Sequence, residues 1–160
     1  MNYRALAVLA TAGCAPTPLP SPPPPSGVSP CVASDLSYAI HGEAPLQLRV
    51  TNAGIHTCTL KGYATVAFAR DERAQPIGAW AEQQPGLIEQ VTLGPGEESV
   101  IMLEIRDPDR YGTDCAPQHV GGLVVRPPQG EAWDFVEYPS LICTSASTPM
   151  LKVWPIGLTP

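Results

Sequence analysis

Short apolar segments separated by turn residues run along the chain from residue 31 onward. Residues 45–53 alternate apolar and polar side chains, and this period of two predicts a strand with one buried face. Further apolar segments rich in β-branched or aromatic residues lie at 32–40, 63–68, 88–93, 100–105, 120–126, 132–142 and 151–154. Glycine and proline occur in nearly every gap, and Pro95-Gly96 is typical of a type II turn. The pattern predicts an all-β fold, an antiparallel β-sandwich of about seven to nine strands.

The composition excludes several alternatives to this fold and limits the partners. Twenty of the 160 residues are proline, which argues against long helices because an interior proline removes a backbone donor. A chain of this length is sufficient for one domain of ordinary size. The 15 acidic and 9 basic residues give a net charge of −6, and the basic residues are scattered singly. We therefore expect no nucleic-acid partner, because binding to phosphates requires a basic face.

Residues 1–13 have the features of an export signal. Arg4 is followed by a short apolar segment, which is too short to span a bilayer but fits the hydrophobic region of a signal peptide. Ala12-Gly13-Cys14 resembles the end of a bacterial lipobox, although Thr11 stands where that motif usually has an aliphatic residue. We expect residues 1–13 to be a lipoprotein signal peptide and Cys14 to be the lipid attachment site. Ordinary secretion is the alternative.

The segment after Cys14 is rich in proline. Half of residues 15–30 are proline, and the segment has no hydrophobic period. At about 3.1 Å per residue, a polyproline II arm of this length reaches roughly 50 Å. We expect residues 14–30 to be a lipidated cysteine and a stalk that holds the domain, residues 31–160, away from the outer face of the membrane. A proline-rich ligand for a partner domain is the alternative.

Five cysteines in a chain of this size indicate an oxidising compartment or a metal site. Cys31 precedes one predicted strand and Cys58 follows the next, so an antiparallel hairpin places these two residues side by side. The same argument pairs Cys115 with Cys143. These two disulfides leave Cys14 as the odd cysteine, and lipidation explains it.

Four segments also resemble a known family. LQLRVTNAGIHTCTLKGYATVAF contains a strand, Asn-x-Gly and Cys-x-Leu-x-Gly-Tyr, and it is followed by VTLGPGEESVIMLEI, CAPQHVGGLVVRPP and ICTSASTPMLKVWP. Over about residues 31–156 the chain resembles an exported actinobacterial family called domain of unknown function 4232. Ala64 departs from that family, which commonly has proline after Gly-Tyr. The resemblance implies an immunoglobulin-like domain without known activity, in which we expect these motif residues to be structural: Asn52, Gly54, Leu60, Gly62, Tyr63, Pro95 and Gly96.

Motifs for catalysis are missing from the sequence. There is no Gly-x-Ser-x-Gly elbow and no phosphate-binding glycine loop. His41, His56 and His119 are far apart in the sequence, and nothing in their spacing selects a serine and an aspartate as partners. His56 and Cys58 could bind a metal, but a disulfide at Cys58 would remove the required thiolate. We expect no catalytic residues, no metal and no cofactor.

Two other groups of residues have a functional and a structural interpretation. Asp107, Asp109 and Asp114 could bind calcium, but aspartate and proline are also common turn residues, and we favour a turn. The aromatic residues could form a sugar-stacking surface, but tryptophans in strands are more often part of the core, which is our expectation for Trp133. The aromatic candidates are Trp80, Trp133, Tyr138 and Trp154.

The sequence therefore predicts an exported envelope lipoprotein, anchored to the membrane, with a non-catalytic binding or structural domain. An envelope protein or a glycan is the expected partner, and the charged loops 70–76 and 106–119 are the expected contact regions. A secreted or envelope hydrolase with unidentified catalytic residues is the alternative function.

Overall fold

The computed structural model describes residues 27–73, 75–144 and 149–158. These residues form strands and two short 3-10 helices, and the described part of the chain contains no α-helix. The strands are β1 (Leu36–His41), β2 (Leu46–Asn52), β3 (Cys58–Lys61), β4 (Thr65–Ala69), β5 (Glu82–Gln83), β6 (Gln90–Leu93), β7 (Glu98–Ile105), β8 (Pro117–Arg126), β9 (Asp134–Cys143) and β10 (Leu151–Val153). The 3-10 helices are η1 (Ala33–Asp35) and η2 (Pro108–Asp114).

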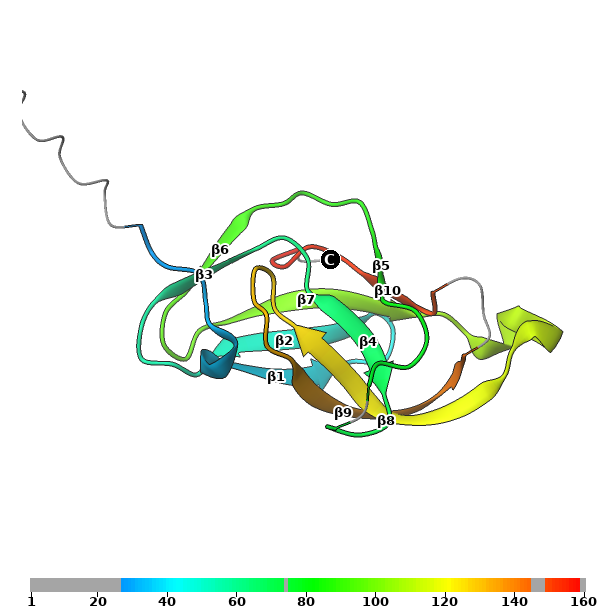
Figure 1. Ribbon diagram of the computed structural model, residues 1–160. Helices are drawn as coiled ribbons and strands as arrows, with labels where there is room; N and C mark the ends of the chain where they lie inside the picture. Colours follow the sequence, from blue (N-terminus) through cyan, green and yellow to red (C-terminus); the bar gives the residue numbers. More distant parts are fainter. Residues whose placement is uncertain (1–26, 74, 145–148, 159–160) are drawn as a thin grey trace, which may run out of the picture.

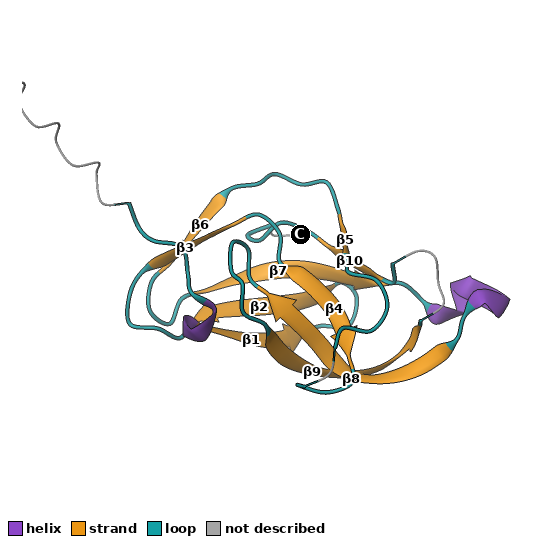
Figure 2. Cartoon of the chain, in the orientation of Figure 1, coloured by secondary structure: helices purple, strands orange, loops and turns teal. Residues whose placement is uncertain are grey.

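The strands form two sheets and a separate pair. One sheet has five strands in the order β1-β2-β7-β10-β5, the other has three strands in the order β4-β8-β9, and β3 pairs with β6. Among these strands every pairing is antiparallel except that of β10 with β5. Figure 1 shows the three-stranded sheet in front of the five-stranded sheet, and Figure 2 shows long loops connecting them. The predicted all-β antiparallel sandwich is confirmed.

The structure has ten described strands, where the hydrophobic pattern predicts seven to nine. The strand β5 has no predicted counterpart because both of its residues are exposed, so it has no buried face to create a pattern. Only its backbone pairing with Lys152 and Val153 of β10 defines it as a strand. The four-residue strand β3 also has no predicted counterpart.

The core lies between the two sheets, as the alternation of apolar and polar residues predicts. On β2, Leu46, Leu48 and Val50 are each at most 1% exposed. Burial of such side chains contributes about 1.5–3 kcal/mol each. The same core cluster includes side chains from both sheets, among them Val66, Phe68, Ile101, Leu103, Leu123, Val125, Ile142, Leu151 and Val153.

The four cysteines of the domain form two disulfides. Cys31 is bonded to Cys58 and Cys115 to Cys143, and the Cα atoms are 4.8 Å apart in each pair. The strand pairs β1-β2 and β8-β9 are the hairpins that bring these residues together, which is the arrangement expected from the sequence.

The chain joins the domain beside one of these disulfides. The backbone N–H of Cys31 donates to the carbonyl of Thr59, and the N–H of Thr59 donates to the carbonyl of Ser29, at 2.9 and 3.0 Å. Residues 29–31 therefore run parallel to β3 along its edge, and Figure 1 shows the chain entering beside β3 and β6. The stalk expected at 14–30 is thus bonded to the domain from Ser29 onward.

The expected signal peptide, Cys14 and the rest of the stalk up to residue 26 lie outside the described residues. Within the described part, no helix has the length and apolar character needed to cross a membrane.

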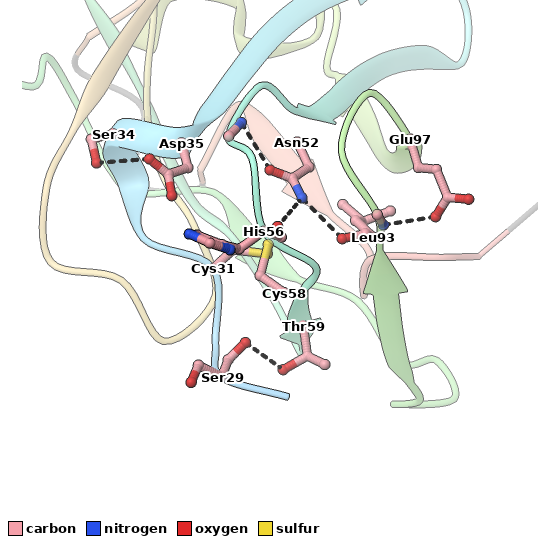
Figure 3. The surroundings of a disulfide bond; sticks show 12 residues. Ser29, Cys31, Ser34, Asp35, Asn52, His56, Cys58, Thr59, Leu93 and Glu97 are labelled. Carbon is pink, nitrogen blue, oxygen red and sulfur yellow. Dashed lines mark hydrogen bonds between the residues drawn. A yellow bond between two sulfur atoms is a disulfide. The ribbon is translucent and has the colours of Figure 1, made fainter. Parts of the chain in front are cut away.

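Asn52 connects three backbone segments near this disulfide (Figure 3). Its side chain is fully buried, and its Nδ2 donates to the carbonyls of His56 and Leu93 at 2.8 and 2.9 Å. Its Oδ1 accepts from the N–H of Gly54 at 3.0 Å. The amide is satisfied at both ends, so Asn52 fixes the loop between β2 and β3 against the end of β6.

The other motif residues also have structural positions. Gly96 has φ +78°, and the N–H of Glu97 donates to the carbonyl of Gly94 at 3.0 Å, which are features of the type II turn expected at Pro95-Gly96. A Cβ on Gly54 would lie 2.8 Å from the Cβ of Asp35, so the close approach of these two segments requires glycine.

Around β3, the motif residues connect it to the rest of the sandwich. Leu60 is fully buried, and the hydroxyl of Tyr63 donates to the carbonyl of Gln84 at 2.7 Å. Gly62 has φ +102°, and its carbonyl accepts from the N–H of Ile156 at 2.9 Å. These contacts hold the segment after β3 against residues from two distant parts of the sequence.

Candidate functional site

The loop after β4 turns back and follows the free edge of that strand. The N–H of Ile77 donates to the carbonyl of Phe68 at 2.7 Å, and the N–H of Ala81 donates to the carbonyl of Val66 at 2.8 Å. Residues 77–81 therefore run antiparallel to β4, on the side that β8 does not occupy. This return path brings Trp80 close to the outer face of the three-stranded sheet.

The second tryptophan comes from the loop between β8 and β9. This loop contains a tight turn, in which the N–H of Gly130 donates to the carbonyl of Pro127 at 3.1 Å and Gln129 has φ +65°. Trp133 follows this turn, directly before β9. Arg126, the last residue of β8, lies on the opposite side of the same loop.

Trp80 and Trp133 stack on each other at the surface. Their ring centroids are 5.1 Å apart, their planes differ by 16°, and the residues are 44% and 43% exposed. The guanidinium carbon of Arg126 lies 4.8 Å from the centre of the Trp133 ring, and its Nη2 donates to Oγ1 of Thr65 at 3.4 Å. The cation–π contact with Trp133 and the hydrogen bond to Thr65 together hold the Arg126 side chain against the indole.

The expectation that Trp133 is a core residue is wrong. The core lies on the inner face of the three-stranded sheet, whereas Trp133 packs beside its outer face. That face carries a small separate cluster in which Ala67, Ala69 and Val124 are buried and Phe135 packs against them. Among the described residues no second sheet covers this face, and the two indoles keep a large part of their surface in contact with solvent.

A cavity of about 320 Å³ opens beside the stacked indoles. We call this cavity and its lining the tryptophan site. The Glu72 carboxylate is 3.8 Å from Nε of Arg73, and both side chains are highly exposed, so this ion pair is weak and leaves Glu72 available to a ligand. The lining residues are Glu72, Gln75, Pro76, Trp80, Val124 and Trp133.

The other two aromatic candidates lie elsewhere. Tyr138 packs against the main core. Trp154 lines a larger cavity of about 480 Å³ together with Met102 and Glu104 from the outer face of β7. Glu104, the charged residue in this lining, already pairs with Nζ of Lys152 at 2.8 Å. This second cavity therefore has fewer free polar groups to orient a ligand than the tryptophan site has.

The charged loops are engaged in local contacts to different degrees. Arg106 forms an ion pair with Glu82 at 2.7 Å and donates to the carbonyl of Pro149 at 3.1 Å, so it belongs to the framework rather than to a free surface. The carboxylate of Asp107 accepts from the N–H of Asp109 at 2.9 Å, which is a turn-forming contact. Loop 70–76 supplies Glu72, Gln75 and Pro76 to the tryptophan site.

The residues considered for catalysis or metal binding do not gather at one place. His41 ends β1, His56 lies between β2 and β3, and His119 lies in β8 opposite Leu141. Cys58 is bonded to Cys31 and therefore offers no thiolate. Across the described ranges, no group of three histidine, cysteine or acidic side chains is placed to hold a metal ion.

One titratable group in the described chain is strongly perturbed. Burial raises the pKa of Tyr38 above the ordinary tyrosine value, and the negative charge of Asp134 raises it further. The hydroxyl of Tyr38 is buried and makes no hydrogen bond to a described residue. This group is neutral at physiological pH and lies outside the tryptophan site.

Comparison with known proteins adds one finding. A family model described as domain of unknown function (DUF4232) matches residues 31–156, which is most of the chain. No curated protein and no solved structure matches this chain.

Proposed function

The chain belongs to the DUF4232 family, and from this premise we propose that it is an exported, membrane-anchored lipoprotein of the cell envelope whose domain binds a partner without catalysing a reaction. The tryptophan site is the observation that carries this proposal. Large aromatic side chains are enriched where proteins bind ligands or other proteins, because they offer much contact area. Here two indoles are stacked, nearly half exposed and placed beside a cavity.

The proposed location rests on the cysteines. The two disulfides are consistent with an exported protein, since disulfides persist in oxidising compartments. They account for four of the five cysteines and leave Cys14, which follows Ala12-Gly13 as in a lipobox. A diacylated cysteine binds a membrane more firmly than one acyl chain does. The proline-rich residues 15–30 would then separate the domain from the membrane surface.

The anchoring part of the proposal is tested by fractionation of cells that express the full chain. We expect the wild-type protein in the membrane fraction and Cys14→Ser in the medium or the soluble fraction. Thr11→Leu, which brings the leader closer to the usual lipobox, is the matched control and should remain in the membrane fraction. Wild-type protein in the aqueous phase of a detergent extraction would contradict lipid anchoring.

The binding part is tested separately with isolated cell envelopes. The full chain should be retained by envelopes from cells that lack it, and Trp80→Ala should reduce this retention. Leu87→Ser, which changes a residue that is 67% exposed on another loop, should not reduce it. Equal retention of the wild type and Trp80→Ala would contradict a binding role for the tryptophan site. In a separate assay, turnover of an ester or glycoside substrate that is lost on mutation of one histidine would contradict a non-catalytic domain.

A further inference from the structure

We infer that the tryptophan site binds a neutral saccharide, with a pyranose ring stacked on the exposed indole surface and its hydroxyl groups bonded to Glu72 and Gln75. This inference rests on the proposed binding function and specifies its ligand class. It follows from the shape, the polar groups and the charges of the site.

The shape of the site suits a small ligand with one flat apolar face. The two indoles stack on each other in nearly parallel planes, so each covers one face of the other, and the stacked pair offers an outward indole face as a flat aromatic platform rather than the perpendicular walls of a cage. The apolar C–H face of a pyranose fits such a platform, because aromatic rings carry negative charge on their faces. The cavity of about 320 Å³ is at the small end of the range of ligand pockets, which is about 300–1,000 Å³.

The polar lining suits a ligand rich in hydroxyl groups. The carboxylate of Glu72 accepts hydrogen bonds, and the side-chain amide of Gln75 both donates and accepts them. Both residues line the same cavity as the two indoles, so a sugar stacked on an indole can direct its hydroxyls toward them. Hydrogen bonds to a charged acceptor are stronger than those between neutral groups, which gives Glu72 the larger share.

The charges of the site favour a neutral ligand over a cationic one. A quaternary ammonium ion also binds indole faces, but Arg126 already places a positive charge 4.8 Å from the centre of the Trp133 ring. A second cation on the same platform would be repelled by it. An anionic ligand would in turn be repelled by Glu72, which lines the same cavity. A neutral saccharide avoids both repulsions.

Equilibrium binding to the full chain tests this inference. The protein is held in a detergent that has no sugar headgroup, and the probes are neutral oligosaccharides of glucose, mannose, galactose and N-acetylglucosamine. Choline and a peptide with the sequence of residues 15–30 serve as cationic and proline-rich probes. We expect at least one neutral oligosaccharide to bind, and neither of the other two probes.

Variants locate the binding. Trp80→Ala should weaken the affinity for the saccharide by a factor of at least about ten, as substitution of an aromatic residue at the centre of a binding site commonly does. Trp80→Phe should restore part of the loss, and Leu87→Ser should have no effect. Glu72→Gln keeps hydrogen-bonding atoms but removes the charge that strengthens their bonds, so it should weaken saccharide binding by a smaller factor than Trp80→Ala does. Unfolding transitions monitor whether each variant remains folded.

Three results would overturn the inference. They are affinity weaker than about 10 mM for every oligosaccharide, saccharide binding that Trp80→Ala leaves unchanged, and binding of choline or the peptide in place of a saccharide. Because envelope retention is measured independently, loss of retention in Trp80→Ala without saccharide binding would reject only the ligand class. Equal retention of both proteins would reject the proposed binding function itself.

Discussion

Asn52 illustrates how a polar residue in the middle of a hydrophobic pattern can be structural. It ends a strand whose inward positions are otherwise leucine and valine, and it is fully buried. Its amide satisfies two carbonyls and one N–H, so burial does not leave its polar atoms without partners. The Asn-x-Gly pattern therefore serves to hold the loop after β2 against the end of β6, which is a structural role.

Substitution of Asn52 by alanine should destabilise the domain strongly. The carbonyls of His56 and Leu93 lose the amide donor, whereas the N–H of Gly54 still donates to the carbonyl of Asp35 at 3.2 Å. We expect a loss of about 2–4 kcal/mol in the free energy of unfolding, measured by urea denaturation. His56→Ala is the control, because only the backbone carbonyl of His56 takes part in this network and its side chain is exposed. A loss smaller than about 1 kcal/mol for Asn52→Ala would show that the network is not important for stability.

Tyr38 gives a prediction at alkaline pH. Because burial raises the pKa of Tyr38 in the folded protein, the folded state keeps this proton when the unfolded chain, with a pKa of about 10, releases it. Stability should therefore fall as the pH rises above about 10. Tyr38→Phe removes a buried hydroxyl without a described partner and should be neutral or stabilising by about 1 kcal/mol at pH 7.

The alkaline effect is measured by urea denaturation of both proteins at pH 7 and pH 11. The wild type should lose more stability than Tyr38→Phe between the two values. A variant that is much less stable than the wild type at pH 7 would show that the hydroxyl has a stabilising role. An identical pH dependence of both proteins would contradict a raised pKa of Tyr38 in the folded state.

At the scale of elements, each disulfide closes the open end of a hairpin. The hydrophobic pattern placed both hairpins correctly, and each pair of cysteines then follows from antiparallel geometry. The pattern did not indicate that residues 29–31 pair with the edge of β3, because this contact uses only backbone groups. The disulfide between Cys31 and Cys58 therefore fixes both the domain and the point where the stalk joins it.

Removal of this disulfide in the double variant Cys31→Ser, Cys58→Ser should cost about 3.5 kcal/mol, since it closes a loop with a sequence separation of 27. The double variant Cys115→Ser, Cys143→Ser should lose a similar amount, since its separation is 28. Protease cleavage near residues 29–31 should increase only in the first variant. Unchanged stability and equal cleavage in the two variants would contradict this account.

For the whole molecule, the sequence predicted the part of the fold that depends on local alternation. Leu46, Leu48 and Val50 show which face of a strand is buried, and hairpins between consecutive strands show which cysteines are neighbours. The tryptophan site was not predictable in this way. Trp80 and Trp133 are 53 positions apart in the sequence, and they meet only because residues 77–81 turn back along β4. The position of Trp133 within the predicted strand 132–142 suggested the core, and the sequence does not indicate that no second sheet of the described residues covers the outer face of its sheet. The sequence nevertheless contained one indication against a core position for Trp80, because the residues next to it, Gly78-Ala79 and Ala81, are small.

The central claim is that the stacked tryptophans form the binding surface of this molecule. The chain contains three tryptophans, so ¹⁵N-labelled indoles give three resolvable N–H signals in an NMR spectrum of the full chain. Titration with a neutral oligosaccharide that binds should shift the signals of Trp80 and Trp133 and leave that of Trp154, which lines the other cavity, in place. A shift of the Trp154 signal alone, or binding without a shift of either stacked tryptophan, would contradict the claim.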